Sequence, residues 1–312
     1  MDKYKFGNSE AWKKAVLKTY SLEEKELEIN GEIVRIFGNG SYYSHTPYIT
    51  DGGYFDKDFI WTKEVFQKIT QPILIKSRNP LNISSEVDYC LVDAYNTYVL
   101  DISKGEEDVW KNKIQAKKRT HIRKGEKSNY TIKFGQSELL DDFYEVMSQA
   151  WLDLGTPTHS KNFYKNIVEN MSSTEEGYYA QFVVIYIEDK PVSAACIIND
   201  DYSLHHPYAA TLKSYNNTSI NNVLYWEIIK YAIKRGCKIF DLGRSKKDQG
   251  TATYKLSFGA EEVNLYYYYF NKTKHDNVED SKITQFLIEC WKKLPLGFAN
   301  FLGPKLIYKV MK

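Results

Sequence analysis

The residues best suited to chemistry lie between Gly236 and Ala260, in the segment GCKIFDLGRSKKDQGTATYKLSFGA. A short apolar run from Lys238 to Leu242 predicts a strand that carries Asp241 at its end, and the Gly, Ser, Asp and Gln residues that follow predict a loop. A carboxylate in that place can act as a general base or bind the ammonium group of an acceptor. An equally good interpretation is a structural aspartate that accepts hydrogen bonds from the loop.

Other polar side chains near this segment are also candidates. Arg244 offers a planar guanidinium suited to phosphate or carboxylate, unless it is a solvated surface residue. His205 and His206 lie on a predicted strand from Tyr202 to Ala210, whose alternation puts one ring in the core and the other on the opposite face. Either ring could act as a base near neutral pH, although structural histidines are more common. We predict a catalytic role for His206 and substrate contacts for His205 and for Tyr208, which we expect on the side of His206.

The segment from Lys111 to Lys124 is strongly basic, because seven of its fourteen residues are Lys or Arg and none is acidic. Closely spaced cations lower the cost of bringing a polyanion near, so Arg119 and Arg123 are predicted to contact a phosphate-bearing ligand. The alternative is a solvated helix face that links two domains. A function carried by these cations alone would be that of a non-catalytic module that binds nucleic acid or phosphoglycan.

The overall composition is that of a globular protein, with 43% hydrophobic residues, 26% charged residues and a formal net charge of +2. Four widely spaced cysteines form no CxxC pair, so neither a metal site nor a disulfide framework is predicted. The motifs GxSxG, HExxH and GxxxxGK are absent, so the chemistries of the serine-hydrolase elbow, the zinc protease and the P-loop are not predicted. Without an apolar signal region or a run of about 18 apolar residues, we expect a cytoplasmic protein.

The apolar periodicity predicts two α/β units. The first, residues 1–110, contains a long loop from Gly38 to Tyr54 in which His45 is a candidate substrate contact. The second, residues 111–277, follows the order strand, two helices, three antiparallel strands, helix, strand, loop and strand. We expect the functional cleft between the two units.

The C-terminal residues predict an amphipathic helix that ends at Pro295. Its apolar stripe consists of Ile283, Phe286, Leu287, Cys290, Trp291 and Leu294. Because such a helix must bury its stripe, and the second unit already has a full set of elements, we expect residues 278–312 to complete the first unit. Contact of the lysine-tipped tail with a membrane surface is the less favoured alternative.

Four segments in chain order resemble the signature of FemAB-like transferases, a tandem branch of the GNAT acyltransferase superfamily. They are KRTHIRKGEK (118–127), WLDLGTPTHS (151–160), WEIIKYAIKRG (226–236) and FDLGRSKKDQGTATYKLSFG (240–259). The resemblance covers about Leu100 to Ala260. It implies two tandem GNAT-like domains of the α/β (α+β) class, each with a mixed, mostly antiparallel sheet flanked by helices.

The resemblance also implies N-acyl transfer. An acyl or aminoacyl group would pass from an activated donor to an amine of a cell-envelope precursor, such as a nucleotide- or lipid-linked sugar or peptide of peptidoglycan or polysaccharide. The donor would be acyl-CoA or aminoacyl-tRNA, with no tightly bound cofactor and no metal. The enzyme would act in the cytoplasm or at the inner face of the membrane.

Two residues take expected roles from this resemblance. The lysine that matches Lys255 lies near the acyl donor, where a fixed cation could stabilise developing negative charge, and Tyr254 beside it is expected to contact substrate. The turn from Thr211 to Thr218, which in typical GNAT enzymes is rich in glycine and holds the CoA pyrophosphate, has no glycine here. The chain also lacks the long charged helical-hairpin insertion common in several members that use aminoacyl-tRNA, so the donor stays open.

Overall fold

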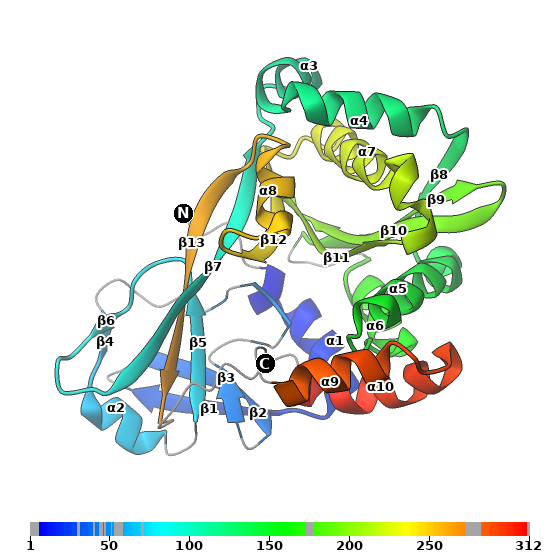
Figure 1. Cartoon of the computed structure of the whole chain (residues 1–312). Coiled ribbons are helices and arrows are strands. Elements are labelled where there is room, and N and C mark those ends of the chain that lie inside the picture. Colours follow the sequence, from blue (N-terminus) through cyan, green and yellow to red (C-terminus); the bar gives the residue numbers. More distant parts are fainter. Residues whose placement is uncertain are drawn as a thin grey trace.

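The structure, a computed structural model, describes residues 6–29, 32–39, 41–43, 46, 48–50, 52, 59–69, 72–172, 177–271 and 282–310. An eleven-stranded sheet runs through the molecule (Figure 1). From edge to edge its strands are β1 (Glu23–Ile29), β2 (Glu32–Asn39), β3 (Ser41–Tyr43), β5 (Ile73–Ser77), β13 (Glu261–Phe270), β7 (Tyr89–Asp101), β12 (Ile239–Lys246), β11 (Ser203–Thr211), β10 (Lys190–Asn199), β9 (Tyr179–Ile187) and β8 (Tyr130–Gly135). Neighbours are antiparallel, except that β3 pairs with β5 and β11 with β12 in parallel. A separate pair is formed by β4 (Ile60–Trp61) and β6 (Asn82–Ile83).

Helices cover both faces of β9, β10 and β11 (Figure 1). On one face lies α7 (Ile220–Lys234), with α4 (Ala116–Glu126) packed against it; on the other lie α5 (Leu140–Leu154) and α6 (Lys161–Asn170), with α1 (Glu10–Tyr20) against α6. Successive β9 residues alternate between the two cores, since Val183 belongs to the α7 side and Phe182 and Val184 to the α5 side. Cover on both faces explains why this strand is apolar throughout.

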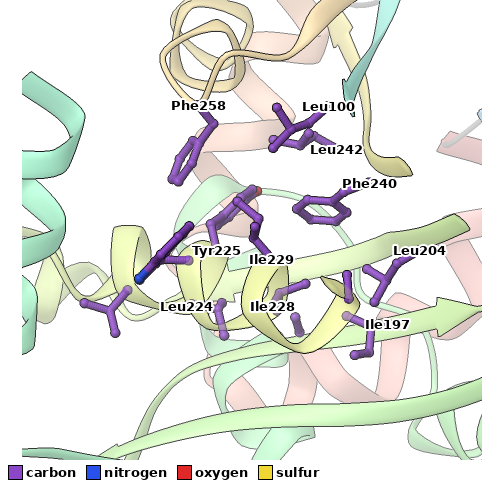
Figure 2. Packing of buried hydrophobic residues seen from close by; sticks show 14 of the residues in the cluster. Leu100, Ile197, Leu204, Leu224, Tyr225, Ile228, Ile229, Phe240, Leu242 and Phe258 are labelled. Atoms are coloured by element: carbon purple, nitrogen blue, oxygen red, sulfur yellow. The ribbon is translucent and has the colours of Figure 1, made fainter. Parts of the chain in front are cut away.

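Figure 2 shows the core on the α7 side. Leu224 and Ile228 of α7 belong to one buried cluster with Leu204 of β11 and Phe240 of β12. Phe240 precedes Asp241 directly, so this cluster anchors the strand that carries the predicted site.

The predicted fold class is confirmed, because the protein has a mixed, mostly antiparallel sheet flanked by helices. The sheets expected in the two units are joined into one, since β7 pairs with β12 across the expected boundary. In addition, β13 lies between β5 and β7, both of which come from the first unit. The division into residues 1–110 and 111–277 stays a prediction.

Two local predictions were wrong. The segment from Gly38 to Tyr54 is not a loop throughout, because β2 continues to Asn39 and β3 follows at once. The strand expected to end at Leu242 continues to Lys246, and α8 (Gly250–Leu256) occupies part of the expected loop. Polar residues extend β12 because β7 offers them a ladder beyond an irregularity between Asp241 and Arg244.

The helices α9 (Lys282–Trp291) and α10 (Leu296–Val310) lie at the end of α5. The expectation that residues 278–312 complete the first unit stays a prediction. Ile288 of α9 lies against Gly155, and Gly303 of α10 lies against the backbone of Thr158. The helix thus packs through a side other than its apolar stripe. Among the described residues, each helix is too short or too polar to cross a bilayer.

Replacing Gly303 by Ala is expected to weaken the packing of α10. An added Cβ would lie 2.9 Å from the carbonyl oxygen and 3.0 Å from the amide nitrogen of Thr158, and backbone atoms cannot rotate away. We expect the free energy of unfolding to fall by about 1–3 kcal/mol. Gly297→Ala is the control, because it lies in the same helix with nothing within 4 Å of its added Cβ. It should gain about 0.5–1 kcal/mol. Denaturant unfolding followed by circular dichroism measures both, and equal stabilities would contradict the close approach.

Candidate functional site

The parallel strands β11 and β12 part in the middle of the sheet. They pair at three positions, the last of which joins His205 to Asp241, although β11 continues to Thr211 and β12 to Lys246. Both strands have a register irregularity close to this point. Where paired strands separate, their peptide groups can hydrogen-bond to an extended ligand instead of to each other. Of the predicted site residues, His205, His206 and Asp241 lie at this point and Lys255 lies beside it.

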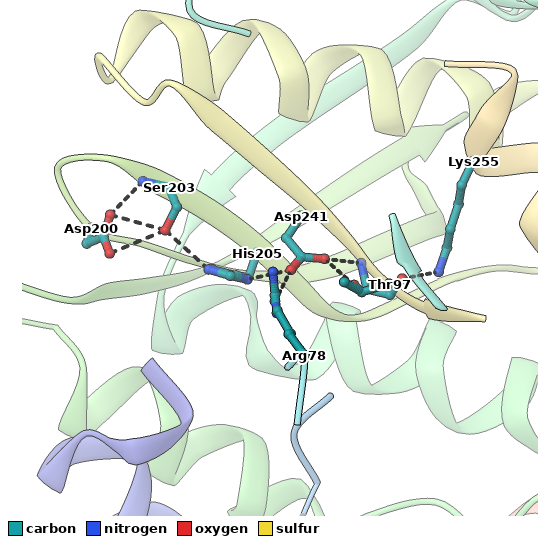
Figure 3. A network of polar contacts seen from close by, with 8 residues as sticks. Arg78, Thr97, Asp200, Ser203, His205, Asp241 and Lys255 are labelled. Atoms are coloured by element: carbon teal, nitrogen blue, oxygen red, sulfur yellow. Dashed lines mark hydrogen bonds and ion pairs between the residues drawn. The ribbon is translucent and has the colours of Figure 1, made fainter. Parts of the chain in front are cut away.

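Asp241 is 2% exposed and accepts hydrogen bonds from three directions (Figure 3). Arg78 Nη2 lies 2.7 Å from Oδ2, while Thr97 Oγ1 and Gly243 N lie 2.8 Å and 2.7 Å from Oδ1. His205 Nδ1 lies 3.7 Å from Oδ2. The carboxylate therefore connects β12 with β7, with β11 and with the residue that follows β5.

These contacts determine the charge of Asp241. Burial would raise the pKa of this carboxyl group, but Arg78, His205 and the hydrogen bonds from Thr97 and Gly243 lower it to about 2. Such a carboxylate stays ionised near neutral pH and holds a proton too weakly to be an efficient general base. Of the two alternatives left by the sequence, the geometry favours an aspartate that positions its neighbours.

Lys255, in α8, is 7% exposed and lies beside the same part of β12. Its Nζ donates to the carbonyl oxygens of Gly243 and Arg244, each at 2.8 Å; Figure 3 shows Lys255 reaching towards β12. Desolvation lowers the pKa of Lys255 to about 8, while the nearby Asp241 raises it. These two bonds use two of the three N–H groups of the ammonium. A partly desolvated cation in this position can polarise a carbonyl group.

His206 points to the α7 side, where its ring lies 4.9 Å from that of Tyr225 and 5.2 Å from that of Phe240. Burial lowers its pKa to about 3, with a further lowering from Lys255, so the imidazole is neutral at pH 7. Its buried Nε2 atom has no hydrogen-bond partner among the described residues. Because buried polar atoms are nearly always paired, this nitrogen is a candidate contact for a ligand.

His205 and Tyr208 face the opposite side of the sheet. The His205 ring lies 4.9 Å from that of Phe6, and Tyr208 packs at 5.3 Å from the ring of His159. We expected Tyr208 on the side of His206, and this was wrong. Between its pairs with β10, β11 has one residue more than its partner, and such a bulge reverses the alternation of side chains.

Arg244 and Tyr254 both adjoin Lys255. The exposed Arg244 guanidinium lies 4.6 Å from the centre of the Tyr95 ring. The Tyr254 ring has Lys118 Nζ 3.6 Å from its centre, and its hydroxyl accepts a hydrogen bond from Asn221 Nδ2 at 3.0 Å. Tyr254 and Lys118 therefore extend the polar group from Lys255 towards the start of α7.

The structure places the other predicted residues elsewhere. Arg119 donates to three backbone carbonyls in and just after the π-helical turn η2 (Val109–Lys113), and the Arg123 guanidinium lies 5.3 Å from the ring of Trp110. None of their described contacts involves Asp241, His206 or Lys255. A pocket of about 320 Å³ here is lined by Glu106, Trp110, Arg123, Glu126 and Trp226. His45 lies outside the described residues.

Three residues of the site were missed by sequence reasoning. Arg78 and Thr97 had no local signal, because their importance comes only from meeting Asp241 across the sheet. Lys118 is 8% exposed, donates to Asn222 Oδ1 at 2.8 Å, and has its pKa lowered to about 8 by burial. Its spacing with Ile122 and Gly125, the other buried residues of α4, was a usable signal.

Known proteins share this sequence pattern and this architecture. Residues 112–256 match the family model described as an acetyltransferase (GNAT) domain. The crystal structure of FemX superposes with a TM-score of 0.62 at 12% identity, covering 85% of this chain and 92% of FemX. The predicted resemblance is borne out to this extent: residues 112–256 match a GNAT acetyltransferase domain, and the chain shares the fold of FemX.

Two further solved structures share the fold of this chain. The C-terminal domain of a putative lysylphosphatidylglycerol synthetase from Agrobacterium fabrum has a TM-score of 0.55 at 12% identity, with coverage of 83% of this chain and 86% of that one. L-PGS from Bacillus licheniformis has a TM-score of 0.52 at 11% identity, covering 94% of this chain and all of its own. No curated protein matches by sequence.

GNAT proteins typically use acyl-CoA as a co-substrate and hold no tightly bound cofactor. Within the part of the chain that the structure describes, no group of three or more His, Cys, Asp or Glu residues is placed to bind a metal ion. Among the described residues, the side chains placed for chemistry where β11 and β12 part are Lys255, His206 and those of the Asp241 cluster.

Replacing Asp241 by Asn is expected to lower the free energy of unfolding by about 3–5 kcal/mol at pH 7, because Arg78 loses a buried counter-charge. The folded-state pKa of about 2 lies below the ordinary value of 3.8, so the carboxylate stabilises the fold fully above about pH 4. This contribution is lost as the pH falls towards 2, and it should be absent in Asp241→Asn.

Asp93→Asn is the control, since Asp93 also lies on a strand of this sheet and pairs with Lys247 but is 49% exposed. Removing that exposed pair should cost less than about 1 kcal/mol. Denaturant unfolding at pH 7 and pH 3 measures both variants. A loss at Asp241 no larger than that at Asp93 would contradict a stabilising buried cluster.

Proposed function

We propose that the protein transfers an acyl or aminoacyl group from an activated donor to an amine of a cell-envelope precursor, such as a nucleotide- or lipid-linked sugar or peptide. The observation that carries the proposal is the group of Lys255, His206 and Asp241 where β11 and β12 part, inside the matched GNAT domain. The shared fold with FemX and with a putative lysylphosphatidylglycerol synthetase supports an envelope-related acceptor. The reaction takes place in the cytoplasm or at the inner face of the membrane.

In the proposed reaction the acceptor nitrogen attacks the donor carbonyl carbon. An N–C bond forms and the C–S bond of a thioester or the C–O bond of an ester breaks. The proton that the amine loses passes to the departing thiolate or alkoxide, so the products are an amide and a free thiol or alcohol. Lys255 stabilises negative charge on the carbonyl oxygen. His206 Nε2 hydrogen-bonds to the substrate as a neutral imidazole. Asp241 keeps β12, His205 and Arg78 in place around them.

The start of α7 bears on the choice of donor. Ile220 N already donates to Thr218 Oγ1 at 3.2 Å, and Asn222 N to Ser219 O at 3.0 Å. Fewer backbone amides are therefore available to hold a pyrophosphate than in a glycine-rich turn. Cations from α4 stand at the same turn, where Lys124 Nζ donates to Asn217 O at 2.7 Å. We propose that these side chains hold the phosphates of the donor, whether acyl-CoA or aminoacyl-tRNA.

The contacts of α4 do not favour a non-catalytic module that binds polyanions. Five of the seven cations between Lys111 and Lys124 contact other protein groups: Lys111 pairs with a carboxylate, Arg119 and Lys124 bond to carbonyls, and Lys118 and Arg123 lie over aromatic rings. Lys117, Arg123 and Lys124 stay exposed, so the segment can hold donor phosphates, but it offers fewer free cations than a module that binds polyanions through charge alone.

The direct test of the proposed function is a transfer assay read by mass spectrometry. The protein is incubated with a panel of acyl-CoAs and charged tRNAs, each with amine-bearing nucleotide- and lipid-linked envelope precursors. We expect one donor class to produce a precursor whose mass has grown by the acyl or aminoacyl group. Transfer only to small-molecule amines, with every envelope precursor unchanged, would refute the proposed acceptor class.

Replacing Lys255 by Ala is expected to lower kcat about 10²–10³-fold, because a donor to the developing oxyanion is lost. With a pKa of about 8, the required ammonium is present below pH 8 and is lost above it, so kcat/KM should fall as the pH rises through 8. Lys255→Arg keeps its charge and should not show this fall. A rate that instead rises through pH 8 would make Lys255 a base and contradict the proposed role.

Replacing His206 by Phe separates binding from packing. The ring lies among Tyr225 and Phe240 and is neutral, so Phe should preserve the thermal unfolding temperature. It removes Nε2, so we expect kcat/KM to fall about tenfold to a hundredfold. His206→Gln, which keeps a hydrogen-bonding side chain, should recover part of the loss. Full activity in His206→Phe would show that the residue only packs.

A further inference from the structure

The two C-terminal helices leave large apolar side chains in water. Ile283, Phe286 and Leu287 on α9 are 74%, 67% and 59% exposed, and they share one helix face because they are three and four residues apart. On α10, Phe298 and Phe301 are 50% and 61% exposed, again one turn apart. We call these five residues the C-terminal apolar face. Monomeric proteins rarely leave large apolar side chains grouped on exposed helix faces, so these residues indicate a partner.

Close packing on the turn after α5 holds these helices with the face outward. Gly155 leaves room for Ile288, which lies on a different side of α9 from the exposed stripe, and Gly303 brings α10 onto the backbone of Thr158. Leu154, next to this contact, is itself 68% exposed. The exposure is therefore a consequence of how the helices are packed and does not come from a frayed end.

The charged residues of the two C-terminal helices are nearly all basic. Residues 282–310 contain five lysines and one glutamate. Glu289 pairs with Lys292 in the next turn of α9, whereas Lys293 is exposed and Lys305 Nζ lies 3.9 Å from the centre of the Phe301 ring. Lysine stems can lie along apolar surface and place the ammonium at its edge. Apolar side chains edged by cations match the boundary between anionic headgroups and acyl chains.

We propose that the C-terminal apolar face docks the protein on an anionic lipid bilayer. Phe286, Leu287 and Phe301 enter the headgroup–acyl boundary, and the neighbouring lysines pair with lipid phosphates. A second copy of the chain fits less well, since a twofold contact through this face would bring two sets of lysines together. The proposal rests on the proposed function and favours the lipid-linked acceptors among those it names. Bilayer binding is measured without any transfer reaction, so each of the two proposals can fail while the other stands.

The test is flotation of the full chain with vesicles of phosphatidylcholine alone or with about one-third phosphatidylglycerol. We expect binding to the anionic vesicles to be at least about tenfold tighter, and to weaken at high salt. The double variant Phe286→Ser/Leu287→Ser should bind at least about tenfold more weakly with an unchanged unfolding temperature, since both side chains are mostly exposed. Leu91→Ser is the control, because Leu91 is 42% exposed on β7 and should not affect binding.

Three results would overturn the proposal. The native chain could fail to float with anionic vesicles, or the double variant could bind as well as the native chain. The native chain could also be a dimer in light scattering that the double variant converts to a monomer, with no vesicle binding by either. That last result would assign the C-terminal apolar face to a second copy.

Discussion

The contact between Asp241 and Arg78 is the one on which the site depends. A carboxylate that is 2% exposed is costly unless a charge and hydrogen bonds surround it. Its partners come from distant parts of the chain, since Arg78 follows β5, Thr97 lies on β7 and His205 on β11. The region predicted as a first unit therefore supplies two of the groups that keep Asp241 ionised. The GNAT domain has its central carboxylate satisfied only when β7 lies against β12.

Two irregularities in the strand pairing, one in β11 and one in β12, position the groups around this buried carboxylate. The extra residue in β11 sends His206 to the α7 side and Tyr208 to the α5 side, so one strand serves both faces. The irregularity in β12 leaves the carbonyls of Gly243 and Arg244 to accept from Lys255 instead of only from a strand. A regular β11 would have placed His206 and Tyr208 on the same face, because strict alternation puts residues two apart on one side of a sheet.

These features explain which parts could be predicted from the sequence. The strands β9 and β10, the helix α7 and the aspartate at the end of an apolar run follow from periodicity, which depends only on neighbours along the chain. A bulge depends on the partner strand, so the side of Tyr208 and the extension of β12 to Lys246 were missed. The role of Arg78 could not be predicted, since it depends on a hydrogen bond to Asp241, which is 163 positions away in the sequence. Lys118 was assigned to a basic surface, although its spacing with Ile122 also fitted a buried face.

The apolar stripe of α9 shows the limit of periodicity most clearly. The spacing of Ile283, Phe286 and Leu287 predicts that one side of the helix is apolar. It does not predict whether that side faces the protein core, a partner or water. Water is the poorest medium for it, since each of these side chains would gain about 1.5–3 kcal/mol from full burial. The protein core does not supply that burial, because Ile288 and not the stripe meets Gly155. The turn that holds the helix continues to His159, which packs on Tyr208 of β11. Whatever covers the stripe is thus held in a fixed orientation to the strands that carry the site.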